Sequence, residues 1–207
     1  MWFWITMLCA ARAEGRVGVD WVPMGRADVV AAVDGATSGT GLSEFDGVLR
    51  PPLTAWAGWQ NGQNAWLWGM AVGWNRTANH IAQTTTVSSR GAIRPSVDLR
   101  HYVEHESIAP WVQVGIYGTV PWARESSDLY TAEEQDALAV TASADRGRIA
   151  GYGIRVGGGA EIILGDGLSI GARWATVFHQ GIVNSEDGIQ VATRLFPEAA
   201  FTMGWRL

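Results

Sequence analysis

The sequence predicts an all-β fold, an eight-stranded antiparallel barrel whose strands run up and down in chain order. Apolar and polar residues alternate with period two through most of the 207-residue chain, as they do in strands with two unlike faces. Glycine is abundant, with 26 residues, which disfavours a helical protein because glycine destabilises helix interiors. Short and long connections also alternate, which is typical of a barrel with two unlike rims. We therefore expect one domain with a single sheet.

Eight segments carry the strand pattern. They are residues 16–23, 53–59, 65–75, 93–103, 111–120, 148–162, 168–178 and 189–207. The short connections, 60–64, 104–110 and 163–167, contain the Gly, Asn or Asp that tight turns favour. The long connections are 24–52, 76–92 and 121–147, with a medium one at 179–188. Within the third long connection, residues 131–142 predict a short helix.

The first 13 residues resemble a signal peptide. An apolar stretch ends in Ala-Arg-Ala, the small-x-small pattern that precedes a cleavage site, so we expect a cut before Glu14 and a barrel over residues 14–207. A buried N-terminal strand is the alternative. The only cysteine, Cys9, lies in this segment. A processed chain without cysteine suits an oxidising compartment in which no disulfide is used. Elsewhere no apolar run reaches the 18 residues of a membrane-spanning helix.

Charged residues fall on one face of nearly every predicted strand. The charged face carries Asp20, Arg94, Asp98, Arg100, Arg155, Glu161, Arg173, Arg194, Glu198 and Arg206. The opposite face carries only Arg148, at a strand end. An arginine on a lipid-facing surface costs roughly 2–4 kcal/mol at the bilayer midplane. A shift of one residue in the last strand would expose three charges to lipid, so the charges fix the register.

The alternation alone also fits a soluble barrel turned inside out, so further features must decide which face points inward. The charged face holds both signs, which can neutralise one another inside a closed barrel, and glycines on that face leave room for long arginines. Trp66 and Trp74 lie eight residues apart on the apolar face, or roughly 20 Å along the membrane normal, close to the separation of two interfacial aromatic girdles. A soluble core is the alternative for these tryptophans. The predicted membrane-interface aromatics are Trp66, Trp74, Trp174, Phe201 and Trp205.

The last strand reads Phe201, Met203, Trp205 on its apolar face and ends in Gly204-Trp205-Arg206-Leu207. This ending resembles the C-terminal signature of small bacterial outer-membrane barrels, although Leu207 replaces the usual terminal aromatic residue. Over residues 16–207 the pattern is similar to the OmpA transmembrane domain and the OmpX group. The resemblance implies a monomer in the outer membrane of a Gram-negative bacterium, in contact with lipid and lipopolysaccharide. It also implies that the barrel-assembly machinery reads the last strand, which then closes against the first.

We expect a structural or surface-interaction role through the external loops. A narrow solute or ion channel is one alternative, although eight strands leave an interior that side chains fill. A lipid-modifying hydrolase is another, because residues 176–188, "TVFHQGIVNSEDG", vaguely resemble the active-site region of lipid A deacylases. There Gly181 and Ile182 stand where that family has serine and asparagine after His179, and Ser185 and Glu186 have the wrong spacing. We therefore predict no catalytic residue.

Other patterns predict no cofactor, metal or nucleic acid. The net charge is −5 and all 15 basic residues are dispersed arginines, which gives no basic footprint for nucleic acid. His101 with residues 104–106 is interpreted as a polar rim beside a turn and not as a metal cluster. Glu133, Glu134 and Asp136 could hold a divalent cation that bridges lipopolysaccharide, with a solvated loop as the default interpretation.

Overall fold

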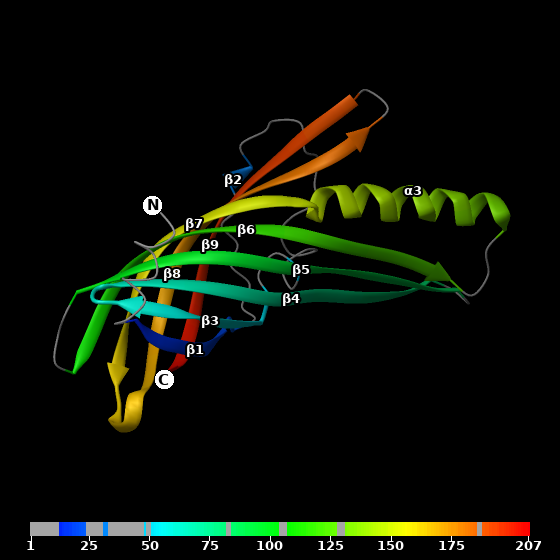
Figure 1. The fold of residues 1–207 in the computed structure, drawn as a ribbon. Helices are drawn as coiled ribbons and strands as arrows, with labels where there is room; N and C mark the ends of the chain where they lie inside the picture. The colour runs from blue at the N-terminus through cyan, green and yellow to red at the C-terminus, as the bar shows by residue number, and fades with distance from the viewer. Residues whose placement is uncertain are drawn as a thin grey trace.

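Eight long antiparallel strands close into one ring, which confirms the predicted fold (Figure 1). The computed structural model describes residues 13–23, 31–32, 48, 51–81, 84–103, 107–127, 131–185 and 188–207. The long strands are β1 (Glu14–Trp21), β3 (Leu53–Asn61), β4 (Asn64–Ile81), β5 (Thr84–Tyr102), β6 (Ile108–Ser127), β7 (Gly151–Ile163), β8 (Leu168–Ser185) and β9 (Gly188–Arg206). A two-residue strand, β2 (Ala31–Ala32), pairs with β9. The predicted signal peptide and most of the 24–52 connection lie outside the described residues.

The barrel closes through its first and last long strands. In this pairing Arg16 lies opposite Arg206, and Trp21 lies opposite Phe201. The backbone N–H of Leu207 continues the ladder by donating to the carbonyl of Gly15 at 2.8 Å. Closure satisfies the backbone groups that an open edge strand would leave unpaired.

The two ends of the barrel differ. At one end, which we call the short-turn rim, residues 62–63 join β3 to β4, and the 3-10 turn η2 (Gly165–Gly167) precedes β8. Gly62 and Gly167 have φ of 56° and 83°, the left-handed region that glycine adopts without a steric cost. At the opposite end, which we call the extended rim, strands β4, β5, β6, β8 and β9 project beyond the barrel wall (Figure 1).

The predicted long connections are wrong in part, because the strands continue through them. Residues 76–92 belong to β4 and β5, with only residues 82–83 between the two strands, and β8 and β9 fill most of 179–188. The first four residues of 84–89, "TTTVSS", are β-branched and suit strands. These residues do not alternate between apolar and polar, and the strand prediction depended on that alternation. A strand that projects beyond the barrel wall needs no apolar face. Period two therefore identified the strands only where one face is apolar.

The helix α3 (Ala132–Ile149) begins where predicted but extends seven residues further than residue 142. Its N-terminus is a capping box: the backbone N–H of Thr131 donates to the Glu134 carboxylate at 2.9 Å, and the Thr131 hydroxyl accepts from the Glu134 N–H. The bond from the Thr131 backbone lowers the pKa of Glu134. Arg148, predicted at the start of a strand, lies in the last turn of α3, and the strand begins at Gly151. None of the helices in the described parts of the chain is long and apolar enough to cross a membrane.

Candidate functional site: the barrel interior and its outer surface

The structure places nearly all of the predicted interior charges inside the wall of the barrel. Of the ten, only Arg206 is half-buried, and the other nine are buried. They alternate along the strands with outward apolar residues, as on β5, where exposed Pro95 lies between buried Arg94 and Ser96. The charged face therefore points into the lumen and the apolar face points outward.

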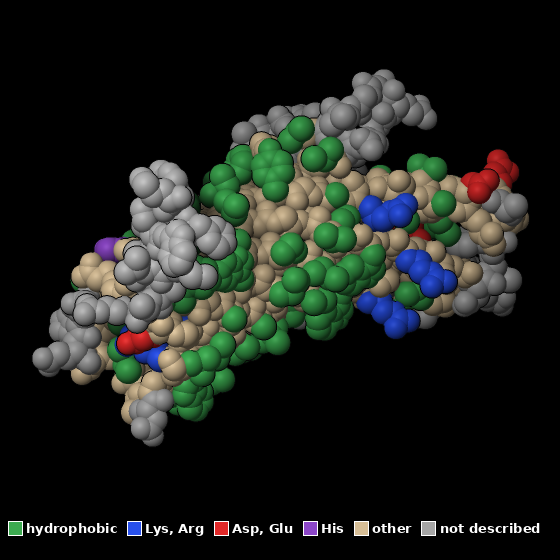
Figure 2. All heavy atoms as spheres, viewed as in Figure 1, with side chains coloured by type: hydrophobic (Ala, Val, Ile, Leu, Met, Phe, Trp, Pro, Cys, Tyr) green, Lys and Arg blue, Asp and Glu red, His purple; other side chains and the backbone are tan. Residues whose placement is uncertain are grey.

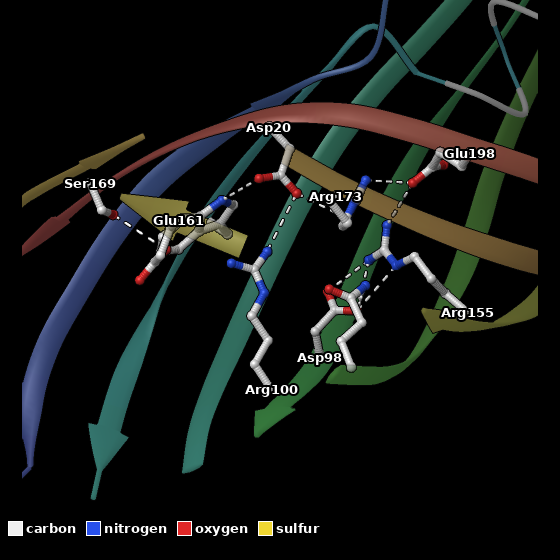
Figure 3. A network of polar contacts seen from close by, with 10 residues as sticks. Asp20, Asp98, Arg100, Arg155, Glu161, Ser169, Arg173 and Glu198 are labelled. Carbon is white, nitrogen blue, oxygen red and sulfur yellow. Dashed lines mark hydrogen bonds and ion pairs between the residues drawn. The ribbon is translucent and has the colours of Figure 1, made fainter. Parts of the chain in front are cut away.

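Six of the buried charges, Asp20, Asp98, Arg100, Arg155, Arg173 and Glu198, form one connected network across the lumen (Figure 3). Arg155 of β7 donates to both carboxylate oxygens of Asp98 on β5, at 2.7 and 2.9 Å. The same guanidinium reaches Glu198 of β9 at 3.4 Å, and Glu198 in turn accepts from Arg173 of β8 at 2.5 Å. Charges of alternating sign thus join four strands by side-chain contacts in addition to the backbone ladders.

Asp20 extends this network to the first strand. Its carboxylate lies 2.9 Å from Arg173 and 3.5 Å from Arg100, and it accepts a hydrogen bond from the Trp56 indole N–H at 2.9 Å. Asp20 is 1% exposed. A buried carboxylate with three donors is stable as a charge only while those donors remain in place.

A second ion pair, which includes a residue that the sequence analysis missed, lies nearer the short-turn rim. Arg16 of β1 pairs with Glu161 of β7 at 2.5 Å and donates to Gln60 at 3.1 Å. Ser169 donates to the same Glu161 carboxylate at 3.3 Å. Arg16 shares a strand face with Asp20, four residues away, so period two could have identified it. Its position at the end of the predicted strand concealed it.

An apolar cluster fills the lumen on the short-turn side of the network. Its members are Trp56, Ala65, Leu67, Tyr102, Ala109 and Trp111. We call this cluster the short-turn plug. The Arg100 guanidinium lies over the Trp111 ring, 4.4 Å from its centroid, and Arg16 lies over Tyr102 at 4.9 Å. These cation–π contacts join the plug to the charges above it.

A second apolar cluster fills the lumen on the other side of the network. Its members are Val48, Ala92, Tyr117, Ile149, Val177 and Phe196. We call it the extended-rim plug. The last residue of α3, Ile149, is fully buried in this cluster, and its carbonyl accepts from the Thr119 hydroxyl at 2.6 Å. On β5 the inward positions run from Ala92 through the network to Tyr102, so the charges lie between two apolar layers.

His179 lies inside the barrel and not at a lipid-facing rim, where the hydrolase alternative requires it. The ring is fully buried, stacks on Tyr117 with centroids 5.9 Å apart, and has Nδ1 3.2 Å from the Tyr117 hydroxyl. Strand β8 continues six residues beyond His179, so this residue is not at the end of its strand. The Ser185 side chain and Glu186 lie outside what the structure describes. His179 is therefore part of the packing around the extended-rim plug.

The predicted interface aromatics all lie on the outer surface. Trp66, Trp74, Trp174, Phe201 and Trp205 are between 45% and 58% exposed. Between them the outward positions of the strands are apolar, as with Val112 and Ile116 on β6. Figure 2 shows these side chains as a broad band over the barrel wall, with charged side chains only beyond its edges.

No group of three metal-ligating side chains occurs among the described residues. The His101 ring lies 3.0 Å from the Asn64 side chain, while residues 104–106 are outside the described part. Of the acidic residues considered for a bridging cation, Glu134 is engaged in the capping box of α3. Glu133 and Asp136 are exposed in the first turns of the same helix.

Replacing Ile149 with alanine should loosen α3 while leaving the barrel folded. Removing a buried isoleucine side chain costs at least about 2 kcal/mol, and this contact holds the end of the helix in the lumen. We expect faster amide hydrogen exchange in α3, with little change in β5 and β8. Val140→Ala is the matched control, because Val140 is 70% exposed on the same helix. Equal exchange in the two variants would contradict an anchoring role for Ile149.

A closed ring of eight strands with a filled, charged lumen and an apolar outer surface defines a small membrane-spanning β-barrel. The solution structure of E. coli Outer Membrane Protein W is similar to this chain, with 13% identity, a TM-score of 0.51, and coverage of 95% of this chain and 97% of that chain. Neisserial surface protein A matches with 9% identity, a TM-score of 0.45 and 94% coverage of each chain. Ail of Yersinia pestis matches with 9% identity, a TM-score of 0.32, and coverage of 92% and 97%.

No known protein-family profile matches the chain, and no curated protein matches it in sequence. The similarity to Outer Membrane Protein W therefore concerns the fold. It extends over nearly the whole of both chains.

Proposed function

We propose that this protein is an integral outer-membrane barrel of a Gram-negative bacterium, with a structural or surface-interaction role. The observation that carries the proposal is the outward apolar surface of a barrel whose charges lie inside. Ile116, for example, is 61% exposed and Arg155 is 5% exposed. A contiguous apolar surface of this extent is not maintained in water by monomeric soluble proteins. If hydrocarbon surrounds the barrel, the apolar side chains on the outside and the charged side chains in the lumen are both explained.

The filled lumen argues against a solute or ion path. The short-turn plug and the extended-rim plug lie on either side of the charge network, and each is made of buried apolar residues. An ion in transit would have to displace both layers and break pairs such as Asp98–Arg155. The position of His179 in the lumen likewise removes the support for a hydrolase at the lipid-facing rim.

The surfaces left for interaction are therefore the outer wall and the extended rim. Strands β4, β5 and β6 project there together with α3 (Figure 1). We propose outer-membrane lipid and lipopolysaccharide as the surroundings of the wall. We also propose that the barrel-assembly machinery recognises β9, whose outward Phe201, Met203 and Trp205 are exposed. Closure of β1 on β9 pairs the strand edges within the barrel wall, which agrees with a monomer.

Cysteine labelling on intact cells tests the location and the orientation together. In a Cys9→Ser background, we compare Val140→Cys, on α3 beyond the extended rim, with Gln63→Cys, in the turn between β3 and β4. A membrane-impermeant maleimide should label the α3 position on intact cells, and the turn position only after the outer membrane is permeabilised. Both variants should fractionate with the outer membrane and migrate on gels in a heat-modifiable way. Recovery of the protein in a soluble fraction would overturn the proposal.

A further inference from the structure

A row of arginines follows directly after the outer aromatic residues at the extended rim. Along the pairing of β4, β5 and β6, Trp74 lies level with Gly91 and Trp122. Two residues further along, on the same outward face, Arg76 lies level with Ser89 and Arg124. Trp74, Trp122, Arg76 and Arg124 are all exposed. On the outward face, aromatic residues are therefore followed by arginines only two residues further along each strand.

Helix α3 brings a third arginine to this row. A groove of about 440 Å³ runs between α3 and the projecting part of β6. Arg124 of β6 and Arg146 of α3 both line it, Glu125 of β6 lines it as well, and the helix side consists mainly of Leu138, Ala139 and Ala142. Figure 2 shows basic side chains gathered on one face over these elements, next to the edge of the apolar band. The groove thus combines basic side chains with an apolar wall.

These arginines are available for a ligand. Within the described residues, no hydrogen bond or ion pair joins the guanidinium groups of Arg76, Arg124 or Arg146 to another side chain. The inward arginine at the same level differs, because Arg90 pairs with Glu125 at 3.6 Å. The acidic residues of the first turn of α3, Glu133 and Glu134, lie at the end of the helix far from Arg146. Glu125, which also lines the groove, lies on the inward face of β6 and is paired with Arg90. On the outward face of β4, β5 and β6 at this level, Arg76 and Arg124 are therefore the only charged side chains in the described part of the chain.

We propose that Arg76, Arg124 and Arg146 bind the phosphate group of a lipid headgroup in the outer leaflet. Two residues along a strand correspond to about 6–7 Å, so these guanidinium groups lie just outside the aromatic residues, at the depth of lipid headgroups. Arginine binds phosphate through paired N–H donors, and these bonds are stronger than those between neutral groups. The α-carbons of Arg76 and Arg124 lie about 10 Å apart across β5, close enough for both side chains to reach one headgroup.

This assignment rests on the membrane location proposed above, and it favours a lipid over a free phosphate ion. Trp74 and Trp122 lie one step nearer the barrel wall than Arg76 and Arg124 on the same outward face, and the apolar outer surface continues from them. A lipid whose phosphate lies at these arginines can place its acyl chains along this apolar surface, which contributes nothing to the binding of an inorganic anion. The ligand class is therefore an amphiphile with a phosphate headgroup.

Calorimetric titration of the folded, full-length protein in a non-ionic detergent tests the proposal. The probes are dihexanoyl phosphatidic acid, dihexanoyl phosphatidylcholine and water-soluble glycerol phosphate. We expect phosphatidic acid to bind most tightly and the double variant Arg76→Gln/Arg124→Gln to weaken it at least about tenfold, because charge-assisted hydrogen bonds are lost. Arg146→Gln alone should weaken binding less. Equal affinity for glycerol phosphate would overturn the assignment to a lipid.

The matched control is Gln63→Glu/Ser107→Asp, which changes the net charge by the same amount at the short-turn rim. Both of these residues are exposed. If the control lowers the affinity as much as the arginine variant does, the effect is one of overall charge and the site does not exist. All variants should retain heat-modifiable migration, which establishes that they fold. If the proposed membrane location were wrong, the cysteine-labelling experiment would show it, because the three arginines are unchanged there.

Discussion

Asp20→Ala is expected to lower the free energy of unfolding by about 3–5 kcal/mol, the range for breaking a buried charge network by removing one partner. Asp20 forms ion pairs with Arg173 and Arg100 and accepts a hydrogen bond from the Trp56 indole, and all three partners are buried. Without the carboxylate, Arg173 retains Glu198 as a partner, whereas Arg100 loses the only ion pair that it forms with a described residue. An uncompensated guanidinium inside a closed barrel is the source of the cost.

Urea unfolding of the protein in lipid vesicles, followed by tryptophan fluorescence, measures this loss. The matched control is Glu125→Ala, which also removes one carboxylate from an arginine. The Glu125–Arg90 pair is longer, at 3.6 Å, and lies at the extended rim, where both side chains retain some exposure. We expect a change of at most about 1 kcal/mol there. Equal losses in the two variants would mean that the central network does not stabilise the barrel.

The sequence predicted the part of the fold that one physical constraint controls. Where a strand has lipid on one side and a packed lumen on the other, its residues must alternate, and the eight strands follow from that alternation. The constraint ends at the extended rim, since Thr85 and Ser88 of β5 occupy a strand that needs no apolar face. The C-terminal end of α3 likewise depends on contacts that the local sequence does not show. The sequence predicted a helix that ends at residue 142, and only the burial of Ile149 among distant strands shows why the helix continues.

The charge network was predictable as a set of residues but not as a set of pairs. Period two places Asp98 and Arg155 on inward faces, while their contact depends on the register of β5, β6 and β7. The two plugs were missed for another reason. Residues such as Trp56 and Trp111 share the face of the charges, so the distribution of charge along the strands does not identify them. A barrel of eight strands has to fill its lumen with large side chains, and these aromatic residues do so.

If the outer wall of the barrel faces lipid, an arginine introduced on the outward face of β6 should lower the free energy of unfolding. The loss should be larger the deeper the arginine lies in the bilayer. Ile116 lies near the middle of the outward positions, between Val112 and Trp122, and Ser126 lies beyond Trp122 on the same face. Ile116→Arg should cost about 2–4 kcal/mol, because the charge would enter the hydrocarbon near the midplane. Ser126→Arg should cost about 0–1 kcal/mol, because the new side chain would meet headgroups and water.

Unfolding in vesicles measures both variants under one set of conditions, and the difference between them is the quantity of interest. If water surrounded the barrel, both substitutions would lie on a solvated surface, where changes stay within about 0.5 kcal/mol. A small loss for Ile116→Arg would therefore remove the membrane location, and with it the lipid headgroup site at Arg76 and Arg124. A large loss at Ile116 with a small one at Ser126 would place the hydrocarbon boundary between them, where Trp122 gives way to Arg124.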